Sequence, residues 1–379
     1  MDLKLKLLRS KLLKQLLRWG LTDAILGLYW GREDSSLWED IKNTGYIDRP
    51  KSIWFEPTMR CNLHCDFCHQ SARRNLNFRE LNIQEIEKFL DYVKSWGIEL
   101  IEMVGGEVFI RDDIFEILDL IEVRGIKVKL GTNGSLLNQD KVERLKAYKS
   151  IESIAISIDA DREVHNSLRK SKDSFQKAYR ALELLCSAPF IVGLYAVITS
   201  ENLDFIGYLI DLASKLEVDR LTFMPEMFYS GDDIKETSEI LGFSQDDRLF
   251  IQQKELEDKK IYLQKNIDAI CEIKDLRKKG TAFTAIYPPI AAKYPLEFFQ
   301  GQVREKHNLL CNNLHSLTVI ENGDVLICPF IYKKIGNITE DDPSKIWNSE
   351  SMQNLRKDIL GNNLLPICKK CCSLGYTLA

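Results

Sequence analysis

The stretch RCNLHCDFC holds three cysteines with a spacing that suits metal binding. Cys61, Cys65 and Cys68 are separated by three and then two residues, so one short loop can present three thiolates. Soft thiolate is the ligand type of iron–sulfur clusters and of zinc. Three thiolates can hold three irons of a four-iron cluster and leave the fourth iron open, as a catalytic metal centre requires. With His64 or His69 as a fourth ligand, the same stretch could instead form a structural zinc site.

A second group of cysteines lies near the C-terminal end of the sequence. Eleven residues, a glycine and four further residues separate Cys311 from Cys328, and the stretch CKKCC adds Cys368, Cys371 and Cys372. Grouped thiolates of this kind indicate a second metal site, either an iron–sulfur cluster or a zinc ion. Because reducing compartments keep thiols reduced, metal binding is favoured over disulfides for the grouped members of the ten cysteines.

The elements that must position the first cysteine group follow a strand-then-helix rhythm. Asn82 and Glu85 predict a capped helix over residues 83–95, and apolar residues at helical spacing predict another over 202–215. Strands that alternate with helices predict right-handed crossovers and a parallel sheet. Six such units predict an α/β fold, a partial (β/α)6 TIM-like barrel with its chemistry at the carboxyl ends of the strands. The predicted strands are Ile53–Phe55, Leu100–Val104, Val128–Leu130, Ile154–Ile158, Val192–Ile198 and Leu221–Phe223.

The first cysteine group, placed directly after the first predicted strand, resembles the signature of the radical S-adenosylmethionine (SAM) superfamily. Further motifs follow in the family's order at the ends of the next strands, and the resemblance covers about residues 50–230. It implies a [4Fe-4S] cluster held by Cys61, Cys65 and Cys68, with SAM bound to the open iron. The residues that the resemblance implies for SAM binding are Phe67, Gly105, Gly106, Glu107, Thr132, Asn133, Ser157, Asp159 and Arg169.

The resemblance also implies an activity. In the family, an electron from the reduced cluster cleaves SAM, and the resulting 5′-deoxyadenosyl radical takes a hydrogen atom from an organic substrate. The sequence does not identify a general acid or base, so the catalytic side chains stay unassigned. A non-catalytic iron–sulfur or zinc protein that keeps the barrel as a scaffold is the alternative from a different class.

The second cysteine group resembles the twitch and SPASM extensions of the same superfamily. Its glycine lies in the stretch ENGD between two apolar runs, 317–320 and 325–327, which predicts a hairpin. The resemblance implies a small twitch-type domain with one auxiliary [4Fe-4S] cluster, for which a zinc ion bound by four cysteines is the alternative. The implied ligands are Cys311, Cys328, Cys368 and Cys371, with Cys372 able to replace Cys371.

The remaining cysteines and the lone histidines indicate structural roles. Cys186 lies in an apolar helical stretch and Cys271 in a charged one, where a thiol commonly fills space. His165, His307 and His315 are isolated in the sequence, and we interpret them as ordinary structural residues.

The chain divides into four predicted segments. These are a basic helical leader over residues 1–49, a radical SAM core over 50–230, a helical and irregular insertion over 231–305, and a twitch-like domain over 306–379. Within the insertion, Ser244 with Asp247 predicts a helix start, and apolar residues continue a long charged helix to Lys279. Prolines predict an irregular connection over 281–299.

Composition limits the class of protein. The 379 residues suffice for two or three domains, and 45% hydrophobic residues exclude a largely disordered chain. A net charge of −4 argues against nucleic-acid binding. No uncharged apolar run reaches the roughly 18 residues of a membrane span, and no signal peptide is recognisable, so a cytoplasmic location is expected. Residues 1–20 carry six basic side chains and one acidic side chain, and a helix docked on its own domain is favoured there over peripheral membrane contact.

An auxiliary cluster with four protein ligands favours an electron-transfer role over substrate binding. The expected reaction is therefore net oxidation of a C–H bond in a small molecule or lipid, with modification of a ribosomal peptide or protein as the alternative. Reduction of the first cluster requires an electron donor such as flavodoxin or ferredoxin. The reaction subclass does not follow from the fold.

Overall fold

The structure is a computed structural model that describes residues 35–74, 76, 78–227, 229–251, 259–303, 308–361 and 364–377. The basic stretch over residues 1–20, with its predicted helix and membrane contact, lies outside the described residues, and so does His307. No helix of the described part is both long and apolar enough to cross a membrane.

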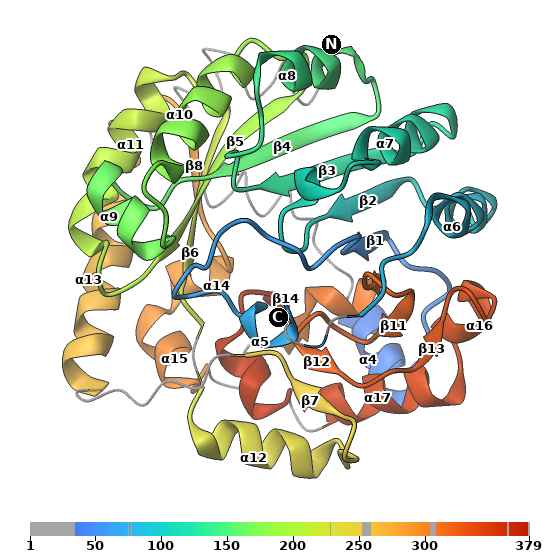
Figure 1. Cartoon of the computed structure of the whole chain (residues 1–379). Helices are drawn as coiled ribbons and strands as arrows, with labels where there is room; N and C mark the ends of the chain where they lie inside the picture. The colour runs from blue at the N-terminus through green and yellow to red at the C-terminus, as the bar shows by residue number, and fades with distance from the viewer. Residues whose placement is uncertain are drawn as a thin grey trace.

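Within these residues, a ten-stranded sheet curves through the molecule, as Figure 1 shows. The strands β1 to β6 lie side by side in chain order and run parallel, as predicted for a partial barrel. Each predicted apolar run forms one of these strands, which confirms the α/β class. Their bounds are β1 Ser52–Phe55, β2 Leu100–Met103, β3 Lys127–Thr132, β4 Ile151–Ser157, β5 Ile191–Ile198 and β6 Arg220–Pro225.

A layer of helices covers the outer face of this sheet (Figure 1). The helix α6 (Ile83–Ser95) begins after Asn82, whose side chain accepts a hydrogen bond from the Glu85 backbone N–H at 2.9 Å, so the predicted capping box is confirmed. Ile53 and Phe55 of β1 are fully buried, and the rings of Phe55 and Phe89 lie 5.8 Å apart. The other helices of the layer are α7 (Ile114–Val123), α8 (Gln139–Ala147), α10 (Ser174–Leu185), α11 (Ile206–Lys215) and α13 (Lys259–Leu276).

The region from 231 to 305 differs from the prediction. The predicted irregular connection contains β8 (Phe283–Ile286), which pairs in parallel with β6 and lengthens the barrel sheet. The helices α14 (Pro289–Lys293) and α15 (Pro295–Gln300) follow, each with proline at its first position. Proline suits that position because its missing N–H would be unsatisfied there anyway, so it starts these helices instead of breaking them.

The predicted helix start at Ser244 is wrong. The Ser244 backbone N–H donates to the Asp247 carboxylate at 2.9 Å, but the chain continues into the short strand β7 (Arg248–Leu249). This strand pairs with β12 (Ile331–Tyr332), so pairing with a distant segment overrides the local helix signal. Within the described residues, the helix of the charged stretch is α13, and it ends at Leu276.

The C-terminal segment is built onto the barrel sheet. The strands β10 (Ser316–Val319) and β11 (Asp324–Leu326) form the predicted hairpin, with Gly323 in the turn at φ +88°. The strand β10 also pairs in parallel with β1, and β13 (Gly336–Asn337) continues the sheet beyond β11. At the other end of the described chain, α4 (Ser35–Thr44) packs on α17 (Glu350–Gly361).

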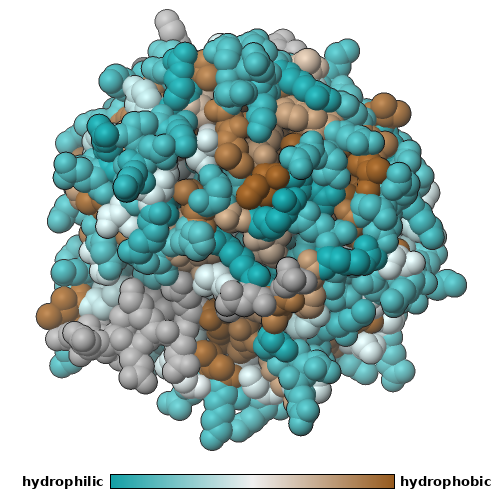
Figure 2. All heavy atoms as spheres, in the orientation of Figure 1, coloured by the Kyte–Doolittle hydropathy of each residue, from teal (hydrophilic) through white to brown (hydrophobic). Residues whose placement is uncertain are grey.

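The main core lies between the sheet and the helix layer. Fully buried residues of neighbouring strands, such as Ile101, Met103 and Val128, share one hydrophobic cluster with Ile86, Ile117 and other apolar residues of the helices. Figure 2 shows that hydrophilic residues cover most of the face seen in Figure 1, while hydrophobic residues gather in a few places near its middle.

Candidate metal centres

The three cysteines of the first group lie in the loop that leaves the carboxyl end of β1. The Cys68 backbone N–H donates to the Cys65 carbonyl at 3.2 Å, and the loop leads into the short helix α5 (Ser71–Arg74). The Asp66 N–H donates to the Leu168 carbonyl at 3.0 Å, which fastens the loop to the end of α9 (Arg162–Leu168). All three cysteine residues are half-buried.

The pKa values of the thiols in this loop depend on burial, on the neighbouring thiols and on two arginines. Burial raises the pKa of Cys61 and raises the pKa of Cys65 to about 11, and the neighbouring thiols add to both rises. The positive charges of Arg74 and Arg169 oppose these rises, the first at Cys61 and the second at Cys65. A metal bound by these thiols would displace their protons.

The two glycines after β2 lie directly against the backbone that leads into the cysteine loop. A Cβ on Gly106 would lie 2.3 Å from the Arg60 carbonyl oxygen, and one on Gly105 would lie 2.5 Å from the Thr58 carbonyl oxygen. The end of β2 therefore packs directly against the backbone that enters the cysteine loop. Side chains at either position would push the two segments apart.

Glu107 joins the ends of β2 and β3 from inside the protein. Its carboxylate is fully buried and accepts hydrogen bonds from the Thr132 hydroxyl at 2.6 Å and the Asn133 N–H at 2.8 Å. Burial raises the pKa of Glu107, although these hydrogen bonds act in the opposite direction. The Asn133 amide nitrogen in turn lies 3.9 Å from the Cys61 sulfur. Glu107 thus orients a residue that contacts the cysteine loop.

Arg169 links the end of β4 with the same loop. Its Nε lies 2.7 Å from the carboxylate of Asp159, and both side chains are buried. The guanidinium lies over the Phe67 ring at 5.6 Å from its centroid. Burial alone would lower the pKa of Arg169, but the charges of Asp159 and Cys65 outweigh it and raise the pKa. Ser157 is half-buried at the end of β4, next to this pair in sequence.

The second group of cysteines lines one cavity. Cys311 ends β9 (Asn308–Cys311), Cys328 follows β11, and Cys368 and Cys371 lie in and directly after a short 3₁₀ turn, η4 (Pro366–Lys370). All four border the cavity, together with residues such as Tyr229 and Phe330. Burial raises the pKa of Cys311 to about 12 and also raises the pKa values of Cys328 and Cys368 well above the usual value of a thiol.

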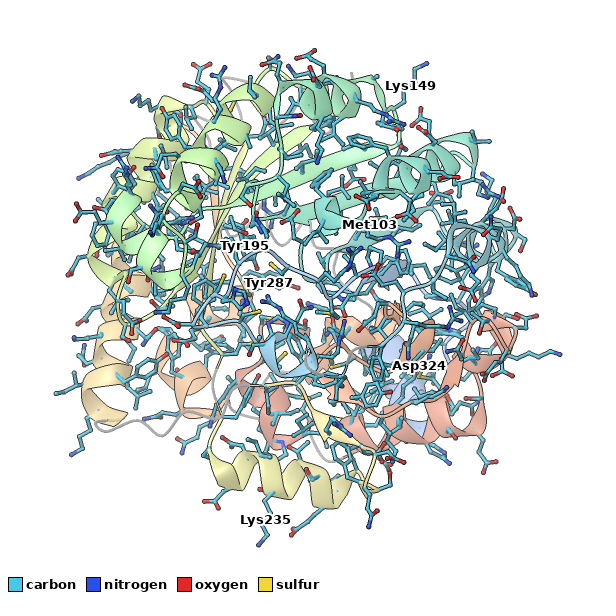
Figure 3. All side chains as sticks on the ribbon, in the orientation of Figure 1. Met103, Lys149, Tyr195, Lys235, Tyr287 and Asp324 are labelled. Carbon is cyan, nitrogen blue, oxygen red and sulfur yellow. The ribbon has the colours of Figure 1, made fainter. Side chains whose placement is uncertain are left out.

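Cys372 does not border the cavity, although its thiol lies beside that of Cys371. Burial raises the pKa values of Tyr195 and Tyr287, and the nearby Cys372 adds to both rises. Figure 3 shows these two tyrosines close together inside the curve of the sheet. Of the two candidates for the last position, the cavity therefore includes Cys371.

Three of the histidines weighed as ligands or structural residues, His69, His165 and His315, are held by packing or hydrogen bonds, whereas His64 is exposed. The His69 ring packs against Phe330 with centroids 4.9 Å apart, and burial lowers the pKa of His69 to about 4. His165 is fully buried, and its Nδ1 accepts a hydrogen bond from the Asp159 N–H at 3.1 Å. His315 is buried against the Trp38 ring.

Two arginines directly behind the first cysteine loop were not identified from the sequence. Arg73 is fully buried and lies 2.5 Å from Glu56 and 3.0 Å from Glu321. The Arg74 Nη2 lies 3.4 Å from the Cys68 sulfur. Two arginines soon after a cysteine motif are a weak signal, because a sequence does not show which arginines fold inward.

Both donor sets consist of thiols, the ligand type of iron–sulfur clusters and of zinc. An iron–sulfur cluster spreads its ligands over several irons, so its thiols need only face a common space. Three thiols in one loop and four thiols around one cavity fit that requirement.

Comparison with known proteins assigns both regions. The chain matches the model of the radical SAM superfamily over residues 55–213 and that of an iron–sulfur cluster-binding domain, SPASM, over residues 311–372. An AdoMet-dependent heme synthase of Methanosarcina barkeri is 33% identical over 44% of this chain and 48% of that protein. The mycofactocin maturase MftC of Mycolicibacterium smegmatis is 31% identical over 45% of this chain and 43% of that protein. The chain therefore spans about half the length of these relatives.

A solved structure shares the fold. SuiB of Streptococcus suis, bound to its precursor peptide SuiA, superposes with a TM-score of 0.62 at 19% identity, over 88% of this chain and 73% of that chain. A likeness at this identity concerns the fold alone. The two matched models assign residues 55–213 to the radical SAM superfamily and residues 311–372 to the SPASM iron–sulfur cluster-binding domain.

Proposed function

We propose that this chain is a radical SAM enzyme whose first cysteine loop holds the SAM-binding [4Fe-4S] cluster. The observation that carries the proposal is the gathering of three thiols at the end of β1, with Arg169 and Asn133 beside them. When bound, the cluster supplies an electron that cleaves SAM and yields a 5′-deoxyadenosyl radical, which takes a hydrogen atom from the substrate. The ligands are Cys61, Cys65 and Cys68.

The surrounding residues position the loop and shield it. Asp159 holds Arg169, and the Arg169 carbonyl accepts a hydrogen bond from the His64 N–H at 3.5 Å, so the loop is tied to the end of β4. The guanidinium also places a positive charge beside Cys65. The SAM site lies, in this proposal, among the ends of β2, β3 and β4, where Gly106, Asn133 and Ser157 are found.

The four-cysteine cavity supports an auxiliary [4Fe-4S] cluster with Cys311, Cys328, Cys368 and Cys371 as ligands. Complete coordination by protein leaves no open iron for substrate, so we assign this cluster to electron transfer. An acceptor close to the substrate radical favours net oxidation of a C–H bond. A small one-electron donor such as flavodoxin or ferredoxin would reduce the first cluster.

Two substrate classes follow from the relatives. The similarity to a heme synthase supports a small molecule, and this is the class we propose, with a lipid included. The similarity to a maturase, and to a structure with a bound precursor peptide, favours a peptide as the second candidate. Incubation with candidate peptides under reducing conditions would produce a mass change if the second candidate is correct.

The proposal is tested by metal content and SAM cleavage. After anaerobic reconstitution the parent should hold about eight irons, and the triple variant Cys61→Ala/Cys65→Ala/Cys68→Ala about four. The triple variant should also lose the 5′-deoxyadenosine that the reduced parent forms from SAM. Cys271→Ala, at an exposed cysteine outside both groups, is the matched control and should retain all iron.

Two results would contradict the assignment. Unchanged iron in the triple variant would remove the cluster from the first loop. Zinc retained in place of iron at the second site would make that site structural and would remove the argument for oxidation.

A further inference from the structure

Arg74 reaches back across the cysteine loop that precedes it. It is the last residue of α5, and its guanidinium contacts two separate parts of the loop. Its Nη1 donates to the Leu63 carbonyl at 2.6 Å, and its Nη2 lies 3.4 Å from the Cys68 sulfur. The guanidinium of Arg74 therefore bridges Leu63, which lies between the first two cysteines, and Cys68, the third cysteine.

Within the part of the chain that the structure describes, no acid neutralises the positive charge of Arg74. Among the described residues no carboxylate forms an ion pair with it, and its buried Nε has no hydrogen-bond partner. The neighbouring Arg73 differs, because it is ion-paired with both Glu56 and Glu321.

These contacts give Arg74 a direct influence on electron uptake. Reduction of an iron–sulfur cluster adds negative charge, and part of that charge resides on the cysteine sulfurs. Hydrogen bonds to those sulfurs and nearby positive charge stabilise the reduced form and raise the reduction potential. A hydrogen bond from a charged donor is stronger than one from a neutral donor.

We propose that Arg74 is a positioning residue that fixes the loop through Leu63 and raises the reduction potential of the cluster through Cys68. The inference rests on the proposed function, because it requires a cluster in this loop. It assigns to one side chain both the shape of the loop and part of the driving force for reduction.

The test is a redox titration followed by electron paramagnetic resonance, with the SAM-binding cluster recognised by the change in its signal when SAM is added. In Arg74→Gln, the ratio of reduced to oxidised cluster at a fixed potential should fall about tenfold, which for a one-electron couple is about 59 mV. Arg79→Gln is the matched control, because Arg79 is an exposed arginine paired with Glu85 and should leave the potential unchanged.

A second variant separates the effect on the potential from simple loss of the loop. Arg74→Lys keeps the charge but cannot reach Leu63 and Cys68 together, so its potential should lie between those of the parent and Arg74→Gln. If Arg74→Gln loses iron, the titration of Arg74→Lys decides the question. Full iron with an unchanged potential in the variant that is titrated would overturn the proposal.

The failure of this inference is distinguishable from the failure of the proposed function. If the triple cysteine variant keeps all its iron, no cluster lies in the loop and both are wrong. If the triple variant loses about four irons while Arg74→Gln keeps the parental potential, the inference alone is wrong.

Discussion

Asp159 and Arg169 form a buried ion pair at the point where β4, α9 and the cysteine loop meet. Both side chains are at least nine-tenths buried, and the carboxylate also accepts a hydrogen bond from the Val197 N–H at 3.0 Å. Such pairs add little net stability compared with apolar residues, but loss of one partner leaves the other charge buried and uncompensated.

We therefore expect Asp159→Asn to lower the free energy of unfolding by about 3–5 kcal/mol. Asparagine keeps the shape of the side chain but removes the charge that faces Arg169. Urea unfolding followed by far-UV circular dichroism measures the change. Asp173→Asn is the control, because Asp173 pairs with Lys177 at the surface, where an ion pair contributes little. Equal effects of the two variants would contradict the assigned role of the buried pair.

At the scale of elements, Arg73 connects α5, the short helix after the cysteine loop, with β1 and the C-terminal hairpin. Glu56 follows β1, Glu321 lies in the turn after β10, and both are bonded to Arg73 of α5. Burial raises the pKa of Glu321 to about 7, with Arg73 acting against the rise and Glu56 and Glu80 adding to it.

This shift predicts a pH dependence of stability. The folded state holds the Glu321 proton more tightly than the unfolded state, whose value is 4.5, so the stabilisation is complete below that pH and is lost as the pH rises through about 7. Between pH 5 and 7 this group alone should remove up to about 1.4 kcal/mol per pH unit from the parent. Glu321→Gln cannot titrate and should show a flatter profile in urea unfolding at several pH values.

The matched control for this prediction is Glu85→Gln. Glu85 is bonded to Arg79, which lowers the pKa of Glu85, so its titration lies below the tested range. A parent profile that Glu321→Gln leaves unaltered would show that Glu321 does not titrate between pH 5 and 7.

Strand and loop positions were predictable because they depend on local patterns. Apolar runs mark strands that are buried on one or both faces, and Asn82 with Glu85 marks the start of α6. The strand β8 and the helices α14 and α15 were missed, because prolines at helix starts resemble breakers in a sequence.

The contacts around the sites were less predictable. The cysteine spacing indicated which thiols could share a loop, but the partners of Arg73 lie far apart in the chain, with Glu321 248 residues away. No periodic pattern reports such a pair. The tight packing of Gly106 on the Arg60 carbonyl also depends on how two segments meet in three dimensions.

At the scale of the whole molecule, the barrel and the C-terminal segment share one sheet. We expect them to unfold together, because β10 is paired with β1 along its whole length. Hydrogen exchange at increasing urea, read by mass spectrometry, should show peptides of β1 and β10 losing protection at the same urea concentration. Peptides of the surface helix α12 (Gly231–Ile240) serve as a comparison for local opening. Earlier loss of protection in β10 than in β1 would indicate two independent units.

The pairing of β1 with β10 also bears on how electrons would move between the two proposed clusters. The loop of Cys61 leaves β1, and Cys328 follows β11, which pairs with β10. Hydrogen bonds between these strands therefore hold the two cysteine groups at a fixed separation. If the separation is constant, domain motion cannot control the rate of electron transfer between the two proposed clusters. The rate of electron transfer would then depend on what occupies the space between the two proposed clusters. With substrate bound in the barrel, the rate would differ from that of the substrate-free protein, although the separation of the clusters is the same.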